Sequence, residues 1–310
     1  MLEIYKTVNN TIERLSTFEP GCWINLVDPS DRELTTVMAA IDVETDFIRA
    51  ALDEEESSRV ETEQGQTLVV VDIPIEADDQ ENSVYTTLPL ALIVMKDYFI
   101  TVCLEDHVFL DDFINNRVKG FVTQFRTRFI LQVLYRNATK YLQYLRMIEK
   151  KSNQLERRMF QSMKNQELIE LLRLEKSLVY FSTSLRANQG VLERLMRNPN
   201  IKNYPDDEDL LENVMIENRQ AIEMAGIYSS ILSTTAETFA SIISNNQNNV
   251  MKILTSVTLV MVIPEIMAGL FGMNVAVPFD DQPYAFWIII ALIVIMCIWL
   301  IVYLNKKDMF

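Results

Sequence analysis

Two long apolar segments near the end of the sequence constrain this chain more than any other feature. They cover Ile253–Phe271 and Tyr284–Leu304, and each is long enough to cross ~30 Å of hydrocarbon as an α-helix. The preceding residues mix charged and apolar side chains, so that the hydrophobic share of the whole chain is an ordinary 49%. The sequence therefore predicts a large water-soluble part followed by two transmembrane helices.

Charges around these segments predict their orientation. Lys252 precedes the first segment, and Lys306 and Lys307 follow the second. The connecting loop contains Asp280 and Asp281 and has no Lys or Arg. Because Lys and Arg accumulate on the cytoplasmic side of membrane helices, we expect both termini to lie in the cytosol and the loop to lie outside the cell membrane.

The first apolar segment also carries a stripe of polar and small residues that the second segment lacks. Spacings of three and four residues place its members on one face of a helix. They are Asn248, Met251, Thr255, Thr258, Val262, Glu265, Gly269 and Gly272. A glutamate is costly in lipid, so Glu265 is expected to face a partner or a water-filled cavity.

This stripe allows two interpretations. Two helices cannot enclose a conduit, so the first interpretation is a pore formed by several copies around a symmetry axis. The second is a helix-association face, in which glycine and threonine allow close packing and Glu265 is a neutral, hydrogen-bonded acid. The spacing alone favours neither interpretation.

The N-terminal part of the chain is predicted to be an α/β domain. The apolar run Cys22–Val27 is followed by Asp28-Pro29-Ser30 and then by a helical pattern, which predicts a strand, a turn and a helix. Thr67–Ile73 is rich in β-branched residues and predicts another strand. Leu90–Met95 and Phe99–Leu104 flank a short turn sequence and are expected to pair as a hairpin.

Long helices are predicted in the middle of the chain. The stretches Phe121–Met163 and Gln166–Met196 are rich in helix-forming residues, with apolar positions recurring at three and four. Phe121, Phe125 and Phe129 fall on one stripe of the first stretch and are expected to form a helix-packing face.

A third and longer helix is expected to lead into the membrane. The acidic residues after Pro205 are typical of a helix N-terminus, because carboxylates there favour the helix dipole. From Asp207 the helical pattern continues to Phe271 without a convincing break. One helix of that length would span ~100 Å at ~1.5 Å per residue.

The expected organisation has six parts. They are a cytosolic α/β domain (1–118), a cytosolic helical region with a long stalk helix (119–252), the first transmembrane helix (253–271), an extracytoplasmic loop (272–283), the second transmembrane helix (284–304) and a cytosolic basic tail (305–310).

Composition excludes several functional classes. The net charge of −15 argues against nucleic-acid binding, because phosphate contacts need clustered Lys and Arg. An acidic surface concentrates cations, although the same charge also serves simply to solvate a protein. His107 is the only histidine, and Cys22, Cys103 and Cys297 are widely separated, which argues against a His-rich metal site and against a disulfide framework. No nucleophile-base pair or phosphate loop is evident, so neither an enzyme nor an organic cofactor is expected.

The motif Gly272-Met273-Asn274 directly follows the first apolar segment. Its placement between two C-terminal apolar helices, after a long helical acidic domain, resembles that in the CorA family of magnesium transporters. Pro264, the run Ala268–Phe271 and the run Val250–Thr255 are also similar to the pore helix of that family. The resemblance covers the whole predicted architecture.

This resemblance implies a funnel-shaped homopentamer in the lipid bilayer, with an α/β cytosolic domain and with the first membrane helix lining the pore. Asn274 would form the outer selectivity ring, and Gly272 and Met273 would hold its loop. The resemblance also assigns the remaining pore positions. Met251, Leu254 and Val262 would be apolar constrictions, and Asn248 would be a polar ring at the cytosolic mouth.

Magnesium chemistry is consistent with such a filter. Mg²⁺ dehydrates reluctantly, so a ring of neutral amide oxygens can accept hydrogen bonds from its water shell without trapping the ion. Inward flow of a divalent ion gains ~4.6 kcal/mol per 100 mV of inside-negative potential, so uptake needs no ATP.

Glu265 departs from the family pattern, because a hydroxyl residue commonly follows the proline at this position. A carboxylate from every subunit would then enter the conduit, and we expect tighter ion binding and an altered preference among Mg²⁺, Co²⁺, Ni²⁺ and Zn²⁺. Two other functions stay open. One is a zinc or cobalt transporter of the same superfamily, proton-coupled through Glu265, and the other is a membrane-tethered helical scaffold without a conduit.

The resemblance further implies cytosolic Mg²⁺ bound between neighbouring subunits, which closes the pore as its concentration rises. The expected position on the stalk helix falls near Asn213, which is not an acid. Glu212 and Glu217 are the candidate regulatory ligands nearby, and the alternative is that they are ordinary solvated helix charges.

Overall fold

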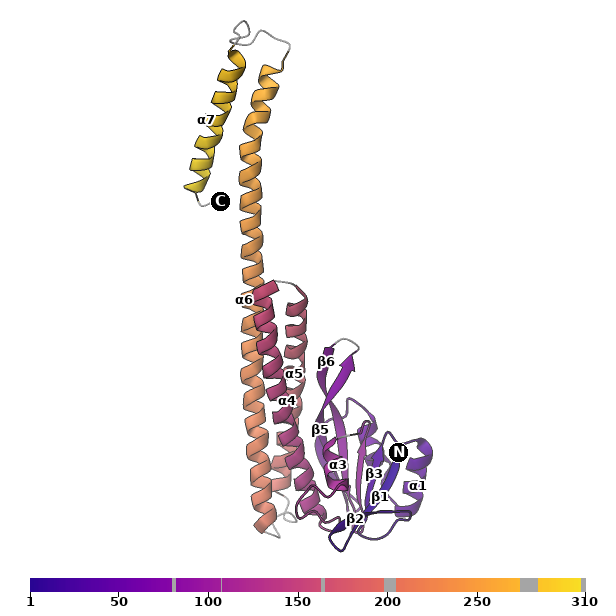
Figure 1. The fold of residues 1–310 in the computed structure, drawn as a ribbon. Helices are drawn as coiled ribbons and strands as arrows, with labels where there is room; N and C mark the ends of the chain where they lie inside the picture. The colour runs from indigo at the N-terminus through magenta and orange to yellow at the C-terminus, as the bar shows by residue number, and fades with distance from the viewer. Residues whose placement is uncertain (80–81, 107, 163–164, 198–204, 274–283, 308–310) are drawn as a thin grey trace. The chain divides into compact units, whose positions relative to one another are not determined.

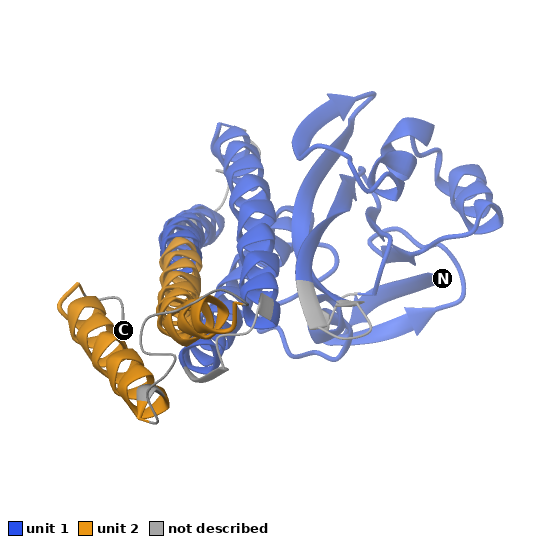
Figure 2. Cartoon of the chain, turned by 90° about the horizontal axis from the view of Figure 1, so that it is seen from above, with its two compact units in different colours: residues 1–236 blue, residues 237–310 orange. Residues whose placement is uncertain are grey.

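Figure 1 shows the computed structural model of the chain, which describes residues 1–79, 82–106, 108–162, 165–197, 205–273 and 284–307. His107, Asn274, Asp280 and Asp281 lie outside these described residues. The chain divides into two compact units, Met1–Ala236 and Glu237–Phe310, which Figure 2 distinguishes by colour.

A seven-stranded sheet forms the centre of the first unit, in the order β2-β1-β3-β7-β6-β5-β4. The strands are β1 (Leu2–Val8), β2 (Thr11–Leu15), β3 (Trp23–Val27), β4 (Arg59–Glu63), β5 (Gln66–Asp79), β6 (Asn82–Val94) and β7 (Phe99–Cys103). The described strands pair antiparallel except β3 and β7, which are parallel. Asn9-Asn10 connects β1 to β2 and Gln64-Gly65 connects β4 to β5, and all four residues have the positive φ that tight two-residue hairpin turns favour.

The structure confirms the predicted strand, turn and helix near the N-terminus. Ser30 caps α1 (Asp31–Ile41) with a capping box, in which its hydroxyl accepts from the Glu33 N–H at 3.4 Å. The Glu33 carboxylate accepts from the Ser30 N–H in return, at 2.9 Å. This reciprocal pairing satisfies two amides that a helix start leaves without partners.

The predicted hairpin is also confirmed, because β6 and β7 pair from Leu90↔Cys103 to Val94↔Phe99. Strands β5 and β6 are longer than expected, since their ladder continues beyond Ile73 as far as Asp79↔Asn82. The acidic and polar residues of that extension hide its strand character in the sequence, whereas continuous pairing between the two strands supplies the hydrogen bonds.

Helices cover both faces of the sheet. On one face, α1 and α2 (Thr45–Arg49) pack on alternate strand residues such as Leu68 and Val70. On the other face, Val69 and Val71 belong to a core that includes α3 (Val108–Ile114) and parts of the three long helices. Alternation of apolar residues along β5 therefore builds two cores from one strand.

The three long helices are α4 (Arg126–Ser162), α5 (Asn165–Met196) and α6 (Pro205–Phe271). Within the first unit they share a third core that includes Leu145, Phe181 and Ala221. The predicted continuous stalk helix is confirmed, because α6 has 67 residues and begins with Pro205 followed by four acidic residues.

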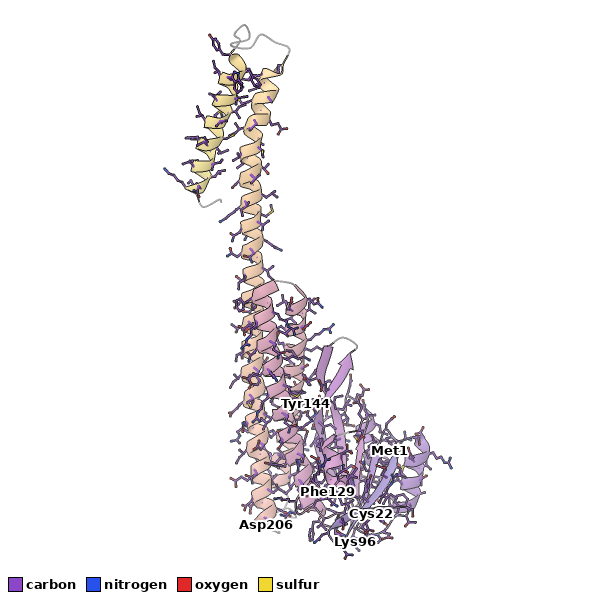
Figure 3. The ribbon with its side chains drawn as sticks, in the orientation of Figure 1. Met1, Cys22, Lys96, Phe129, Tyr144 and Asp206 are labelled. Carbon is purple, nitrogen blue, oxygen red and sulfur yellow. The ribbon has the colours of Figure 1, made fainter. Side chains whose placement is uncertain are left out.

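The predicted phenylalanine stripe is wrong. Helix α4 begins at Arg126, so Phe121 precedes it. Phe125 stands directly before its first residue, where its carbonyl oxygen accepts from the Phe129 N–H at 2.9 Å. Phe129 lies where α4 meets the sheet (Figure 3), with its ring 5.1 Å from that of Trp23 and 4.4 Å from that of Phe121. Phe125 is instead 59% exposed.

The second unit contains the C-terminal part of α6 and the helix α7 (Ala285–Asn305). Both helices are long and apolar enough to cross a membrane, with mean hydropathies of 2.0 and 3.0 in their most apolar windows. Most of their large apolar side chains are exposed, as Trp287 at 70% and Met261 at 66% illustrate.

Candidate ion pathway

The predicted pore stripe lies on the outer surface of α6 in the second unit. All of its described members are exposed except Val262, which is half-buried. The exposed members are Asn248, Met251, Leu254, Thr255, Thr258, Glu265, Gly269 and Gly272. The helix brings these residues together along one side, as their spacing of three and four requires.

Helix α7 packs against a different side of α6. The covered α6 residues recur at three and four: Ser256, Val260, Ile263, Met267 and Phe271. The covered α7 residues follow the same spacing: Ile289, Ile293, Cys297, Leu300 and Leu304. At 3.6 residues per turn, the covered side of α6 is roughly opposite the pore stripe. This packing leaves the stripe free.

Pro264 contributes to the contact between the two helices. A proline has no N–H, so the carbonyl of Val260 four residues earlier lacks its usual helical donor. The Cys297 thiol of α7 lies with its Sγ 3.8 Å from that carbonyl oxygen and donates a weak hydrogen bond to it. This contact between Cys297 and Val260 was not predicted from the sequence. The spacing of three and four residues from Ser256 to Phe271 was the signal that could have located the side of α6 that faces α7.

Glu265 directly follows the proline and is the only charged residue of Ile253–Phe271. Its side chain is exposed and forms no hydrogen bond or ion pair with another described residue. Because a carboxylate is costly in hydrocarbon, this face of α6 is suited to water or to a polar partner rather than to lipid.

The described part of the Gly-Met-Asn motif begins at the end of α6. The Gly272 N–H donates to the carbonyl oxygen of Ala268 at 2.9 Å. A Cβ atom on Gly272 would lie only 2.9 Å from that same oxygen, so a larger residue would displace the backbone. Met273 is 55% exposed, and Asn274 lies outside the described residues.

The structure separates the two candidate regulatory glutamates. Glu212 lines a pocket of about 600 Å³ along α6, together with Glu208, Arg219 and Glu223, and Met196 at the end of α5 contributes to it. Glu217 is half-buried and does not line this pocket. Across the described ranges, no three His, Cys, Asp or Glu side chains gather closely enough to hold a metal ion within one chain.

Comparison with known proteins agrees with this architecture. Residues 19–307 match the family described as CorA-like Mg²⁺ transporter protein. The chain is 27% identical over 291 residues to the cobalt/magnesium transport protein CorA of Methanocaldococcus jannaschii, and the match covers 92% of this chain and 90% of that protein.

Solved structures extend the likeness to three dimensions. The complete structure of the CorA magnesium transporter from M. jannaschii matches with a TM-score of 0.81 and 25% identity, covering 98% of this chain and 96% of that chain. The full-length CmaX protein matches with a TM-score of 0.73 over 98% of this chain and 97% of that chain, but at 14% identity it shows the fold alone. With a family match that spans nearly all of its residues, this chain belongs to the CorA family.

Proposed function

We propose that this chain forms a homopentameric channel in the cell membrane that carries Mg²⁺ into the cytosol, driven by the membrane potential. Co²⁺ and Ni²⁺ are further candidate ions. Both termini and the α/β domain lie in the cytosol. The observation that carries the proposal is the free polar stripe on α6, because α7 packs on the side roughly opposite to it.

Several copies of α6 around one axis would turn their stripes inward. Asn274, held by Gly272 and Met273, forms the outer selectivity ring, and its neutral amide oxygens bind the hydrated ion weakly enough for release. Asp280 and Asp281 in the outer loop attract cations toward this ring. Met251, Leu254 and Val262 form apolar constrictions, and Asn248, Thr255, Thr258 and Gly269 complete the lining.

Glu265 tunes the ion preference of this pathway. Its carboxylate from each copy would raise the local concentration of divalent cations and strengthen their binding. A proton-coupled zinc or cobalt transporter is the second candidate function, and the exposed, unpaired Glu265 side chain is the observation that favours it.

Cytosolic Mg²⁺ closes the channel in this proposal. The ion binds between neighbouring subunits near Glu212 and Glu217, where acids of two chains supply the oxygen ligands that Mg²⁺ prefers. Sites of this kind would need a second copy, which is consistent with the lack of a metal cluster among the described residues of one chain.

Uptake into proteoliposomes under an imposed inside-negative potential tests the function. The wild type is expected to take up Mg²⁺ and Co²⁺, and Asn274→Ala is expected to lower or abolish that uptake. Ile298→Ala is the matched control, because Ile298 is 56% exposed on α7 and lies off the α6 stripe. No divalent flux by the wild type under any potential or proton gradient would contradict the channel and favour a scaffold.

Glu265→Gln tests the ion preference in the same vesicles. The neutral amide is expected to weaken divalent binding and to change the relative uptake of Mg²⁺, Co²⁺, Ni²⁺ and Zn²⁺. A proton gradient applied without a potential distinguishes the second candidate, since only a proton-coupled transporter would respond to it. Unchanged flux, selectivity and pH dependence in Glu265→Gln would exclude a role for this carboxylate.

A further inference from the structure

Asp72 in β5 occupies an unusual position in the sheet. It lies opposite Pro89 of β6, and a proline cannot take part in a hydrogen-bonded antiparallel pair, which exchanges two N–H···O bonds. The N–H and C=O of Asp72 therefore point to the other edge of β5. Pairing with β4 begins only at Arg59↔Val70, so no described strand lies beside Asp72.

A side-chain amide from α5 replaces the missing strand. Asn188 Oδ1 accepts from the Asp72 N–H at 2.9 Å, and Asn188 Nδ2 donates to the Asp72 carbonyl oxygen at 2.8 Å. From α4, Asn137 Nδ2 and the Tyr141 hydroxyl donate to the same oxygen at 2.9 and 3.2 Å. Asn188 is only 3% exposed, so these bonds are shielded from water.

A second buried amide connects α5 to α6 at the same level of the bundle. Asn218 of α6 is also 3% exposed, and its Nδ2 donates to the Leu185 carbonyl oxygen at 3.1 Å and to Gln189 Oε1 at 3.0 Å. Leu185 and Gln189 lie within one helical turn of Asn188. Two buried asparagines therefore join β5 to α5 and α5 to α6 in succession.

We propose that Asn188 and Asn218 form a polar relay that couples displacement of the sheet to α6. Apolar contacts between layers are non-directional and permit sliding, whereas a buried amide loses its partners unless both sides move together. Both asparagines are positioning residues that act through α6. The inference rests on the proposed function only for its effect on transport, because α6 continues into the candidate pore helix.

Hydrogen exchange of the full chain in lipid nanodiscs tests the relay without requiring flux. Asn188→Ala is expected to raise amide exchange at least tenfold in β5 around Asp72 and also in α6 over residues 211–225. Asn218→Ala is expected to raise exchange in the same two regions from the other end. In the double variant, amide exchange around Asp72 should not exceed that of Asn188→Ala, and exchange in residues 211–225 should not exceed that of Asn218→Ala. Either substitution alone already interrupts the relay.

Ser177→Ala is the matched control. Ser177 is fully buried on α5, and its Oγ accepts from the Tyr85 N–H of β6 at 3.1 Å. It therefore ties the sheet to the same helix, but it lies about two to three turns from Leu185 and Gln189, which hold Asn218 of α6. Its loss is expected to raise exchange near Tyr85 and to leave residues 211–225 unchanged.

A transport measurement supplies the second readout. In Asn188→Ala proteoliposomes, the Mg²⁺ concentration that half-inhibits uptake is expected to shift at least fivefold, with no shift in Ser177→Ala. The relay is overturned if amide exchange rises only in the element that lost its hydrogen bond. It is also overturned if Ser177→Ala raises exchange in residues 211–225 as much as Asn188→Ala does. A wild type without flux would contradict the proposed function, and hydrogen exchange would still decide the relay. If Asn188→Ala does not fold, the same hydrogen-exchange measurement on Asn218→Ala tests the relay.

Discussion

The two units of this chain differ in how much apolar surface they expose. In Met1–Ala236 the apolar residues are inside, as Trp23 at 0% exposure shows, and buried polar groups such as Asn188 are hydrogen-bonded. In Glu237–Phe310 the large apolar residues Trp287 and Ile295 are 70% and 64% exposed, while the small polar Ser256 is fully covered. The two units therefore suit different solvents, since burying apolar surface gains no hydrophobic free energy in lipid.

The largest effect is expected in the aromatic core of the first unit. Phe129→Ala should lower the free energy of unfolding by about 3–5 kcal/mol, because it removes a buried ring and leaves a cavity. Trp23 is 5.1 Å from this ring, so tryptophan fluorescence during urea unfolding can measure the change. Phe125→Ala is the control, and its 59% exposed ring should change stability by less than about 0.5 kcal/mol. Equal losses of unfolding free energy in Phe129→Ala and Phe125→Ala would contradict the prediction that burial of the ring determines the effect.

The second prediction compares two exposed isoleucines, one in each unit. Ile295→Lys should disfavour membrane insertion of α7 by about 3 kcal/mol if its exposed side faces lipid. Ile169→Lys in α5 replaces a residue of similar exposure, 53%, and should be almost neutral in water. A glycosylation-based insertion assay for the first variant and urea unfolding for the second provide the measurements. A lysine tolerated at both positions would contradict the difference in solvent.

The smallest expected effect concerns a charge in the first unit. Burial raises the pKa of the Asp72 carboxyl, against the opposing effect of hydrogen bonds from Ser184 and Ser58. The folded state therefore retains this proton to a higher pH than the unfolded state, and the associated stability is lost as pH rises through the folded pKa. Asp72→Asn should gain stability relative to wild type at neutral pH, and the gain should shrink as pH falls through the raised folded pKa towards the unfolded value of ~4.

Unfolding midpoints measured across this pH range check the sign of the effect. Asp97→Asn is the control, because Asp97 is exposed in the turn between β6 and β7. A relative stability of Asp72→Asn that is independent of pH, or that falls as pH rises, would contradict the assignment.

Sequence periodicity was sufficient for the long helices. Apolar residues at three and four predicted α5 and α6 to within two residues, because packing of one helical face governs those positions. Phe121 and Phe125 show where this reasoning fails. Their spacing matches a helix, but they precede α4, and one spacing cannot tell a helix from the turn before it.

The position of the polar stripe on one side of α6 was predictable for the same reason, since it depends only on spacing within one helix, and its role as a pore lining stays a prediction. The contacts of Asp72 were not, because Asn188 lies 116 residues away in sequence and its partner is a main-chain group. Pro89 inside an apolar run was the available signal, as a proline in a strand has no N–H to donate to its neighbour. Local patterns specify faces of elements, whereas bonds between distant elements need the fold.

The continuous α6 helix also determines how the chain responds to a protease. Domains are usually joined by exposed linkers that proteases cleave first. Here the boundary between Ala236 and Glu237 falls inside a helix, where the peptide bonds are held by successive N–H···O=C bonds. Limited digestion should therefore spare the boundary, and the part of α6 that belongs to the first unit should stay covalently joined to the second unit after the loops have been cut.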